Sequence, residues 1–320
     1  MAKKIMLAGG AGYIGSMLTP ALLEHGYTVE VIDLCWFGCN LPPEVKVTRK
    51  NLFDCRENDF EGFDQIIFLA GLSNDPMAEY SPSNNFIYNA ALPSYLAYIA
   101  KRVGVKRYIY ASSCSVYGYT INQLYDEESP ATCGYPYGIS KLQGERGVTQ
   151  LADNKFSVIS LRQGTVCGHS PRMRFDLIVN TMFKTAITEG RIVVNNPAIW
   201  RPIYDLRDAV NAYLRSIQSD YTVNGVFNVT SGNYTVGQVA DLVKREIEKL
   251  TGKRIIIELK NIEDFRNYKV TWEKAKTELG FQPKMDIPDI VADLYDHLQQ
   301  YGDFSDDRYY NIKTFKTISL

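Results

Sequence analysis

The sequence lacks the features of membrane-spanning, secreted and nucleic-acid-binding proteins. No apolar run approaches the roughly 20 residues that are needed to cross a bilayer. The short apolar stretch after the N-terminal lysines breaks at Gly9, so it predicts a buried strand rather than a signal peptide. The net charge is −1 and no basic run is present, so we expect neither a membrane nor a nucleic acid as a partner.

Cysteine and histidine are too few and too scattered for a metal centre or a disulfide framework. The six cysteines contain no C-x-x-C pair, and only three histidines are present, His25, His169 and His297. We therefore expect reduced thiols, a cytoplasmic location and no metal site.

Short apolar runs alternate with helical patterns through the first half of the chain. The expected strands cover residues 5–8, 28–32, 65–70, 107–111 and 157–161. Helical spacing of apolar residues follows the first strand and recurs at 88–103 and at about 137–152. This alternation predicts an α/β fold with a doubly wound parallel sheet, whose strand ends meet at one edge and bind ligands there. The region after Arg172 departs from the alternation and predicts a smaller mixed α/β part.

A glycine motif follows the first expected strand. Gly9, Gly12 and Gly15 form G-x-x-G-x-x-G between that strand and a helical pattern. Glycine suits this position because the turn is tight and a pyrophosphate must approach the backbone at the helix N-terminus. A glycine triplet alone also fits an ordinary strand–helix turn, but here the strand, the helix and the acidic residue described next all agree.

Asp33 stands at the end of the second expected strand. A carboxylate at this place accepts hydrogen bonds from the hydroxyls of an adenosine ribose and repels a 2′-phosphate. The sequence therefore predicts a dinucleotide site that prefers NAD to NADP.

Three residues are candidates for proton transfer. Tyr137 and Lys141 are four positions apart, so they share one face of a helix. A nearby ammonium lowers the pKa of a phenol, which can then act as a general base for a sugar hydroxyl. Ser113 follows the strand that ends at Ala111 and can hydrogen-bond the reacting oxygen. The fold is expected to bring all three to one cleft.

Together these motifs resemble the extended short-chain dehydrogenases/reductases, in the NAD-dependent nucleotide-sugar epimerase/dehydratase group. Further matching stretches are Leu69-Ala70-Gly71, Ser112-Ser113-x-x-Val116-Tyr117-Gly118, Leu161-Arg162 and Arg201-Pro-Ile-Tyr-Asp-Leu-Arg-Asp208. The resemblance implies NAD contacts from Gly9, Gly12, Tyr13, Ile14, Gly15, Asp33, Asn51, Leu52, Leu69, Ala70, Gly71, Asn89, Ser112, Tyr137 and Lys141.

The residues after Ser113 bear on the reaction. Dehydratases of this group place Asp and then Glu there, whereas this chain has Cys114 and Ser115, neither of which can do the work of a carboxylate. A small hydroxyl residue at position 115 resembles the 4-epimerase pattern. The resemblance thus implies redox chemistry at C4 of a nucleoside diphosphate sugar. A net 4-dehydrogenase or 4-keto reductase is the alternative, and a catalytically idle NAD-sensing regulator is a third hypothesis.

Substrate binding calls for fixed cations, because a diphosphate is held well by the planar donor fork of arginine. The resemblance implies this role for Arg201 and Arg266, with Arg172 and Arg174 as further candidates. The full set of expected substrate contacts is Ser73, Ser115, Thr165, Arg172, Arg174, Arg201 and Arg266.

The resemblance also implies a division of the chain and an assembly. We expect an NAD-binding Rossmann domain in residues 1–166 with a returning segment at about 203–228. The nucleotide-sugar-binding part then takes 167–202 and 229–320. A homodimer is expected as well.

Overall fold

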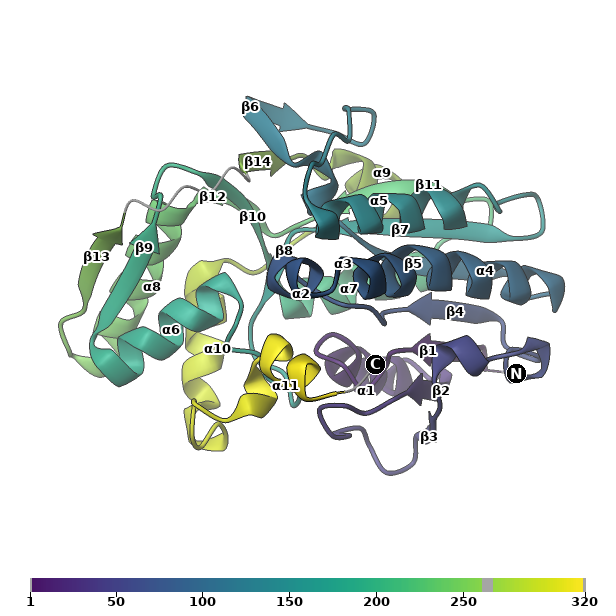
Figure 1. Ribbon diagram of the computed structural model, residues 1–320, viewed down its shortest axis with the longest axis horizontal. Helices are drawn as coiled ribbons and strands as arrows, with labels where there is room; N and C mark the ends of the chain where they lie inside the picture. The colour runs from purple at the N-terminus through teal and green to yellow at the C-terminus, as the bar shows by residue number, and fades with distance from the viewer. Residues whose placement is uncertain (1, 261–266, 319–320) are drawn as a thin grey trace.

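A seven-stranded parallel sheet forms the centre of the protein in the computed structural model, which describes residues 2–260 and 267–318 (Figure 1). The strand order is β11-β7-β5-β4-β1-β2-β3, so the chain reverses its direction of travel across the sheet between β1 and β4. The seven strands are β1 (Lys4–Ala8), β2 (Thr28–Asp33), β3 (Lys46–Arg49), β4 (Gln65–Phe68), β5 (Arg107–Ser113), β7 (Ser157–Gln163) and β11 (Gly225–Val229). The predicted doubly wound sheet is confirmed.

Helices cover both faces of this sheet, because alternate residues of each strand point to opposite sides. In β1, Ile5 and Leu7 enter one apolar core, and Met6 and Ala8 enter another. The first core lies under α1 and α7, which contact each other, and the second lies under α4 and α5. The helices of the two layers are α1 (Gly15–Glu24), α2 (Asp75–Tyr80), α3 (Pro82–Phe86), the π-helical segment η3 (Ile87–Ala91), α4 (Leu92–Arg102), α5 (Pro136–Thr149) and α7 (Leu206–Gln218).

A smaller mixed part stands beside the carboxyl ends of the central strands, on the left of Figure 1. Its strands form one three-stranded and two two-stranded sheets: β12-β10-β8, β13-β9 and β14-β6. The strands are β6 (Tyr119–Tyr125), β8 (Thr165–Cys167), β9 (Arg191–Asn195), β10 (Trp200–Asp205), β12 (Gly232–Thr235), β13 (Ile256–Lys260) and β14 (Asn267–Val270). The helices are α6 (Ile178–Glu189), α8 (Val236–Thr251), α9 (Glu273–Leu279), α10 (Ile287–Asp296) and α11 (Asn311–Thr317).

Several element boundaries differ from the predictions, and the strand expected at 157–161 runs on to Gln163. The strand expected at 65–70 ends at Phe68, where the chain turns toward Gly71. The helix expected at 88–103 begins earlier, as α3, and passes through η3 before α4. The strand expected at 107–111 runs on to Ser113. β11 falls at the end of the returning segment expected at about 203–228. The exact division of the chain into two parts stays a prediction.

Candidate active site

A cleft of about 670 Å³ runs along the carboxyl ends of the central strands. It lies where the strand order reverses between β1 and β4, the place at which open α/β sheets bind ligands. Its walls come from the glycine loop after β1, the loops after β2, β4, β5 and β7, and residues of α5, α6 and α11.

The glycine loop fits a dinucleotide. Gly9 has a φ of +87°, and a Cβ added there would lie 2.5 Å from the Ala70 backbone nitrogen, so the protein itself requires glycine. A Cβ added at Gly15 would collide with the Gly10 carbonyl. Gly12 is different, because a Cβ there would meet only the Gly9 carbonyl, at 3.4 Å, and would otherwise enter the cleft. Glycine at position 12 therefore leaves space for a ligand at the N-terminus of α1, as a pyrophosphate requires.

Asp33 lies beside this loop at the end of β2. Its carboxylate accepts hydrogen bonds from the Ala11 nitrogen (3.0 Å) and the Cys35 nitrogen (2.7 Å). Burial raises the pKa of Asp33, whereas these two N–H groups and the charge of Arg172 lower it. The carboxylate lines the cleft and keeps acceptor capacity for the hydroxyls of a ribose.

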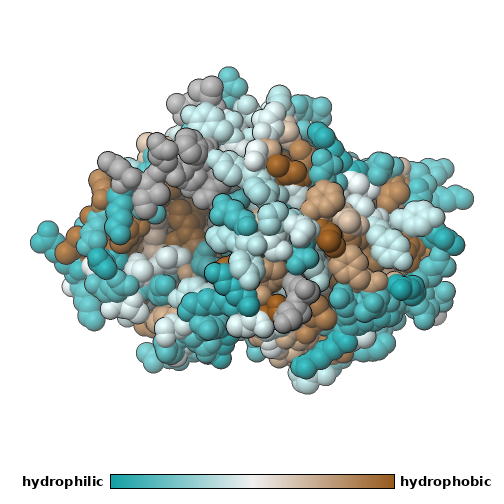
Figure 2. Space-filling model, in the orientation of Figure 1, coloured by the Kyte–Doolittle hydropathy of each residue, from teal (hydrophilic) through white to brown (hydrophobic). Residues whose placement is uncertain are grey.

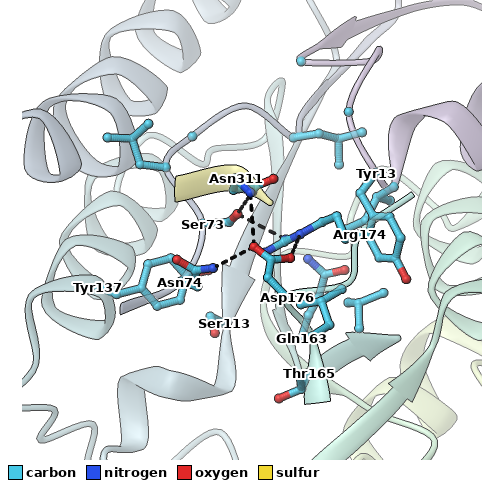
Figure 3. Close-up of a pocket in the computed structure, with 18 of the residues that line it drawn as sticks. Tyr13, Ser73, Asn74, Ser113, Tyr137, Gln163, Thr165, Arg174, Asp176 and Asn311 are labelled. Atoms are coloured by element: carbon cyan, nitrogen blue, oxygen red, sulfur yellow. Dashed lines mark hydrogen bonds and ion pairs between the residues drawn. The ribbon is translucent and has the colours of Figure 1, made fainter. Parts of the chain in front are cut away.

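Tyr137, from the first turn of α5, and Ser113, from the end of β5, lie close together on one side of the cleft (Figure 3). Lys141 lies one turn further along α5, where its Nζ donates to the Ala111 carbonyl at 2.7 Å. Lys141 is 6% exposed, and burial lowers its pKa to about 7.

The environment of Tyr137 differs from the prediction. We expected the ammonium of Lys141 to lower the pKa of the phenol, but the principal influence is burial, which raises it, followed by the charge of Asp75. Ser113 and the guanidinium of Arg174 act in the opposite direction. The cation that lowers the pKa of Tyr137 is therefore Arg174, on the opposite wall of the cleft.

Arg174 belongs to a polar cluster with Asp176, Ser73, Asn74 and Asn311 (Figure 3), in which Arg174 and Asn311 are buried. It forms two hydrogen bonds to the Asp176 carboxylate, at 2.8 and 3.1 Å, and a third to the Ser73 hydroxyl at 3.2 Å. Asn74 also donates to Asp176, at 3.3 Å. Because Asp176 already balances its charge, Arg174 is a weaker anchor for a diphosphate than its sequence suggests.

Arg172 and Arg201 also line the cleft. Arg172 is 4% exposed, its guanidinium lies 3.6 Å from the ring centroid of Phe37, and its buried Nε has no hydrogen-bond partner among the described residues. Burial lowers the pKa of Arg172 to about 9. Arg201 enters from β10, with its Nη1 donating to the Trp200 carbonyl at 2.9 Å.

Most of the predicted site residues line this one cleft. They are Gly9, Gly12, Tyr13, Ile14, Gly15, Asp33, Asn51, Leu52, Leu69, Ala70, Gly71, Ser73, Ser112, Ser113, Ser115, Tyr137, Thr165, Arg172, Arg174 and Arg201. Lys141 lies behind the lining. Arg266 falls outside the residues that the structure describes.

The predicted cofactor contact of Asn89 is not supported by its geometry. Asn89 is fully buried, and its Oδ1 accepts from the Leu72 nitrogen at 3.0 Å. Its Nδ2 donates to the Leu72 carbonyl, to Asn85 and to Ser140. With both polar atoms engaged, Asn89 holds the loop after β4 in place, and its contact with the cofactor stays a prediction.

The cleft residues that were not expected from the sequence include Asn74, Asp176, Asn311 and Trp36. The Arg-x-Asp spacing of residues 174 and 176 was the one available signal for the ion pair. Nothing in the sequence places Asn311 near Ser73, which is 238 residues away.

The first half of the chain and more matches a known family. The model of the NAD dependent epimerase/dehydratase family matches residues 5–230. A UDP-glucose 4-epimerase of Neisseria meningitidis serogroup C is 25% identical, with 92% of this chain and 96% of that protein covered.

Solved structures share the fold at lower identity. A UDP-glucose 4-epimerase of Thermotoga maritima, determined with UDP-glucose, has a TM-score of 0.82 at 23% identity and covers 94% of this chain and 100% of its own. TunA, described as an NAD-dependent NDP-hexosamine 5,6-dehydratase involved in tunicamycin biosynthesis, has the same TM-score at 22% identity, with 95% and 100% covered. One fold thus carries different reactions, so the reaction must be argued from the site.

Proposed function

Because the chain belongs to the NAD-dependent epimerase/dehydratase family, we propose that it is an enzyme that inverts C4 of a nucleoside diphosphate sugar. Its cofactor is NAD, and the glycine loop and Asp33 are the residues that would hold it. Bound NAD supplies a hydride acceptor that can later return the hydride. The observation that carries the proposal is a cleft that combines this loop with Tyr137 and Ser113.

The chain's own residues would handle the proton. The Tyr137 phenolate removes the proton of the C4 hydroxyl as C4 loses its hydride, which leaves a 4-keto sugar. Ser113 hydrogen-bonds the reacting oxygen throughout. Lys141 ties α5 to the end of β5 through the Ala111 carbonyl and so fixes Tyr137 relative to Ser113. After the 4-keto sugar has rotated within the cleft, Tyr137 returns the proton and C4 is reduced on its other face.

The absence of a carboxylate after Ser113 argues for epimerisation over dehydration. Cys114 is fully buried, and its thiol contacts the Arg162 carbonyl, away from the cleft. Ser115 lines the cleft and is within 3.3 Å of the Tyr268 hydroxyl. Neither group can remove and donate protons at neighbouring sugar carbons as a pair of carboxylates does.

Substrate anchoring is proposed for Arg201 and Arg266 ahead of Arg172 and Arg174, and Arg201 is the one of the first pair that the structure describes. Replacement of Arg201 by Ala should weaken binding of the nucleotide sugar and leave the affinity for NAD unchanged. Calorimetric titration with each ligand tests this, since an equal loss for both ligands would indicate a structural role.

An experiment on products tests the reaction. The purified protein is incubated with UDP-, GDP-, CDP- and dTDP-hexoses, and the products are analysed by mass spectrometry after chromatography. Unchanged mass with a new retention time supports 4-epimerisation. Loss of two hydrogens means net oxidation by a 4-dehydrogenase, and NAD binding without turnover across the panel supports the regulator instead.

The predicted homodimer and location belong to the same proposal. Ile87, Tyr95 and Tyr98 are 39%, 43% and 49% exposed and follow one another at helical spacing on the outer side of η3 and α4. In Figure 2 brown, apolar residues gather near the middle of the front face, among pale and teal ones. All six cysteines are free, as expected in a reducing, cytoplasmic setting. Among the described residues no helix is both long and apolar enough to span a bilayer.

A further inference from the structure

The C-terminal segment crosses from the smaller part of the protein to the nucleotide-binding loops. Residues 303–317, here called the strap, follow α10 and end in α11. In Figure 1 the strap lies in front of the cleft region, between the central sheet and the smaller part. Asn311 and Ile312 are themselves part of the cleft lining. A ligand that fills the cleft therefore has the strap as one of its walls.

The first attachment of the strap is an aromatic cluster on the smaller part. The ring of Phe175 lies 4.7 Å from that of Phe304 and 5.1 Å from that of Tyr309, measured between centroids. The Phe175 nitrogen also donates to the Tyr309 carbonyl at 3.1 Å. This cluster keeps the beginning of the strap on the loop that carries Arg172 and Arg174.

The second attachment is Asn311, which is 7% exposed and contacts three residues of the cleft lining. Its Nδ2 donates to the Ser73 hydroxyl at 2.7 Å, and its backbone nitrogen donates to Asp176 at 3.3 Å. Its Oδ1 accepts a hydrogen bond from the Arg172 guanidinium. Figure 3 shows Asn311 above the Arg174–Asp176 pair, pointing at Ser73.

The third attachment is Phe315, which is 3% exposed and packs with Leu72 and Met77. Its ring centroid lies 6.4 Å from that of Trp36 in the loop after β2, the loop that follows Asp33. The far end of the strap thus rests on the same loops that line the nucleotide end of the cleft.

We propose that the strap retains NAD between turnovers, with Asn311 as its positioning residue. The inference rests on the proposed 4-epimerase function and makes it more specific. An epimerase returns the hydride within the same turnover and has no need to exchange its cofactor, whereas a net dehydrogenase must release reduced cofactor every time. A strap fixed at three places beside the cleft suits an epimerase, which keeps its NAD, and would hinder a dehydrogenase, which must release reduced cofactor.

The decisive measurement is the rate at which bound NAD leaves the protein. NAD-loaded wild type, Asn311→Ala and a control, Thr317→Ala, are diluted into buffer with an NAD glycohydrolase that destroys free NAD, and the remaining bound NAD is quantified by chromatography. Thr317 is exposed on α11 and its hydroxyl donates only to the Thr314 carbonyl. We expect release about 10- to 100-fold faster from Asn311→Ala, because buried partners lose their hydrogen bonds, and no change in the control.

Two further readouts separate retention from a general structural defect. The kcat of Asn311→Ala should return to the wild-type value at saturating NAD, whereas a general structural defect would lower kcat at every NAD concentration. The milder Phe315→Leu variant should release NAD at an intermediate rate. Equal release rates in wild type, Asn311→Ala and Phe315→Leu would overturn the proposal, as would a kcat of Asn311→Ala that saturating NAD does not restore.

The same samples distinguish failure of this inference from failure of the proposed function. Wild type that converts a nucleotide sugar, but loses NAD as fast as Asn311→Ala does, contradicts the strap and leaves the epimerase proposal standing. Wild type that retains NAD, with faster loss in Asn311→Ala but no turnover on the sugar panel, supports the strap and contradicts the epimerase.

Discussion

The Tyr137 phenol is under opposing influences that its sequence motif did not reveal. Burial and Asp75 raise its pKa, whereas Ser113 and Arg174 lower it. The spacing to Lys141 correctly places both residues on one helix, but the Lys141 ammonium donates to the Ala111 carbonyl. The pKa of Tyr137 therefore depends on residues outside α5 as much as on α5 itself. The positive charge of bound NAD would lower this pKa further, as Arg174 does.

Replacing Tyr137 with Phe should lower kcat about 10²- to 10⁴-fold, the usual contribution of a general acid–base group. The variant keeps the ring in its place, so NAD should still copurify in wild-type amount. Steady-state rates and the NAD content of the purified protein check this. Near-normal turnover would move the proton transfer to another group, with Tyr135 as the first alternative.

Replacing Asp33 with Ser should narrow the preference for NAD over NADP. The carboxylate that repels a 2′-phosphate is removed, while a hydroxyl can still accept one of the two backbone hydrogen bonds that Asp33 receives. Binding of both cofactors to protein stripped of ligand is measured by calorimetry. Equal affinity of the unmodified protein for NAD and NADP would contradict the role given to Asp33.

Single residues also mark the limit of what the sequence could predict. The glycine loop, Asp33, Ser113 and Tyr137 were found because their chemistry depends on local spacing, which the sequence records directly. Asn89 was predicted to contact the cofactor, but a sequence alone does not distinguish an asparagine buried against the loop after β4 from one that binds a ligand. Asn311 was missed because its partner Ser73 is 238 residues away and only the folded chain joins them.

Among the elements, α5 shows how a helix of low intrinsic stability can hold the proposed catalytic residue Tyr137 in a fixed position. It contains Gly138, Gly144 and Gly147, although each glycine in a helix costs about 1 kcal/mol relative to Ala. A Cβ at Gly144 would collide with the Asn89 carbonyl, and one at Gly147 with the Ser94 hydroxyl. The glycines thus allow α5 to pack tightly against η3 and α4. Its far end is fixed by the buried ion pair of Glu145 with Arg162, 2.6 Å apart.

A second contact between elements gives a prediction about pH. The ring of His169, in the loop after β8, is stacked on that of His297 at the end of α10, with centroids 3.7 Å apart. The Tyr301 hydroxyl lies 3.1 Å from His169 Nδ1, and Asp293 faces His297. Burial, and then the charge of His297, lower the pKa of His169 to about 4.

Below about pH 6.5, His169 is protonated in the unfolded chain but stays neutral in the folded protein until the pH approaches 4. The free energy of unfolding should therefore fall as the pH drops toward 4. After allowance for partial exposure, we expect a loss of about 1–2 kcal/mol from this group. Urea unfolding at fixed NAD concentration, from pH 7 to pH 4.5, checks it. The decrease in the free energy of unfolding should be smaller in His169→Gln. It should be unchanged in the control His25→Gln, which removes an exposed histidine just after α1. Identical pH profiles for all three proteins would rule out the stacked His169–His297 pair as the cause.

For the whole molecule, the remaining prediction concerns assembly. The stripe of Ile87, Tyr95 and Tyr98 lies on the outer side of the helices that pack against α5, the helix that carries Tyr137. Three large apolar groups at helical spacing on one exposed face are typical of an interface, because their burial against a second copy removes apolar surface from water.

A Tyr95→Glu/Tyr98→Glu double variant should therefore be a monomer where the unmodified protein is a dimer, since the new carboxylates would be buried against their own symmetry copies. The control is Tyr119→Glu, which makes the same type of substitution once, at a tyrosine 54% exposed on β6, in the smaller part. Light scattering coupled to size-exclusion chromatography gives the mass of each protein. Because the interface would support α4 and, through it, α5, we also expect the double variant to lose part of its kcat at unchanged NAD content. A dimer that survives the double substitution, or one that Tyr119→Glu dissociates, would place the interface elsewhere on the molecule.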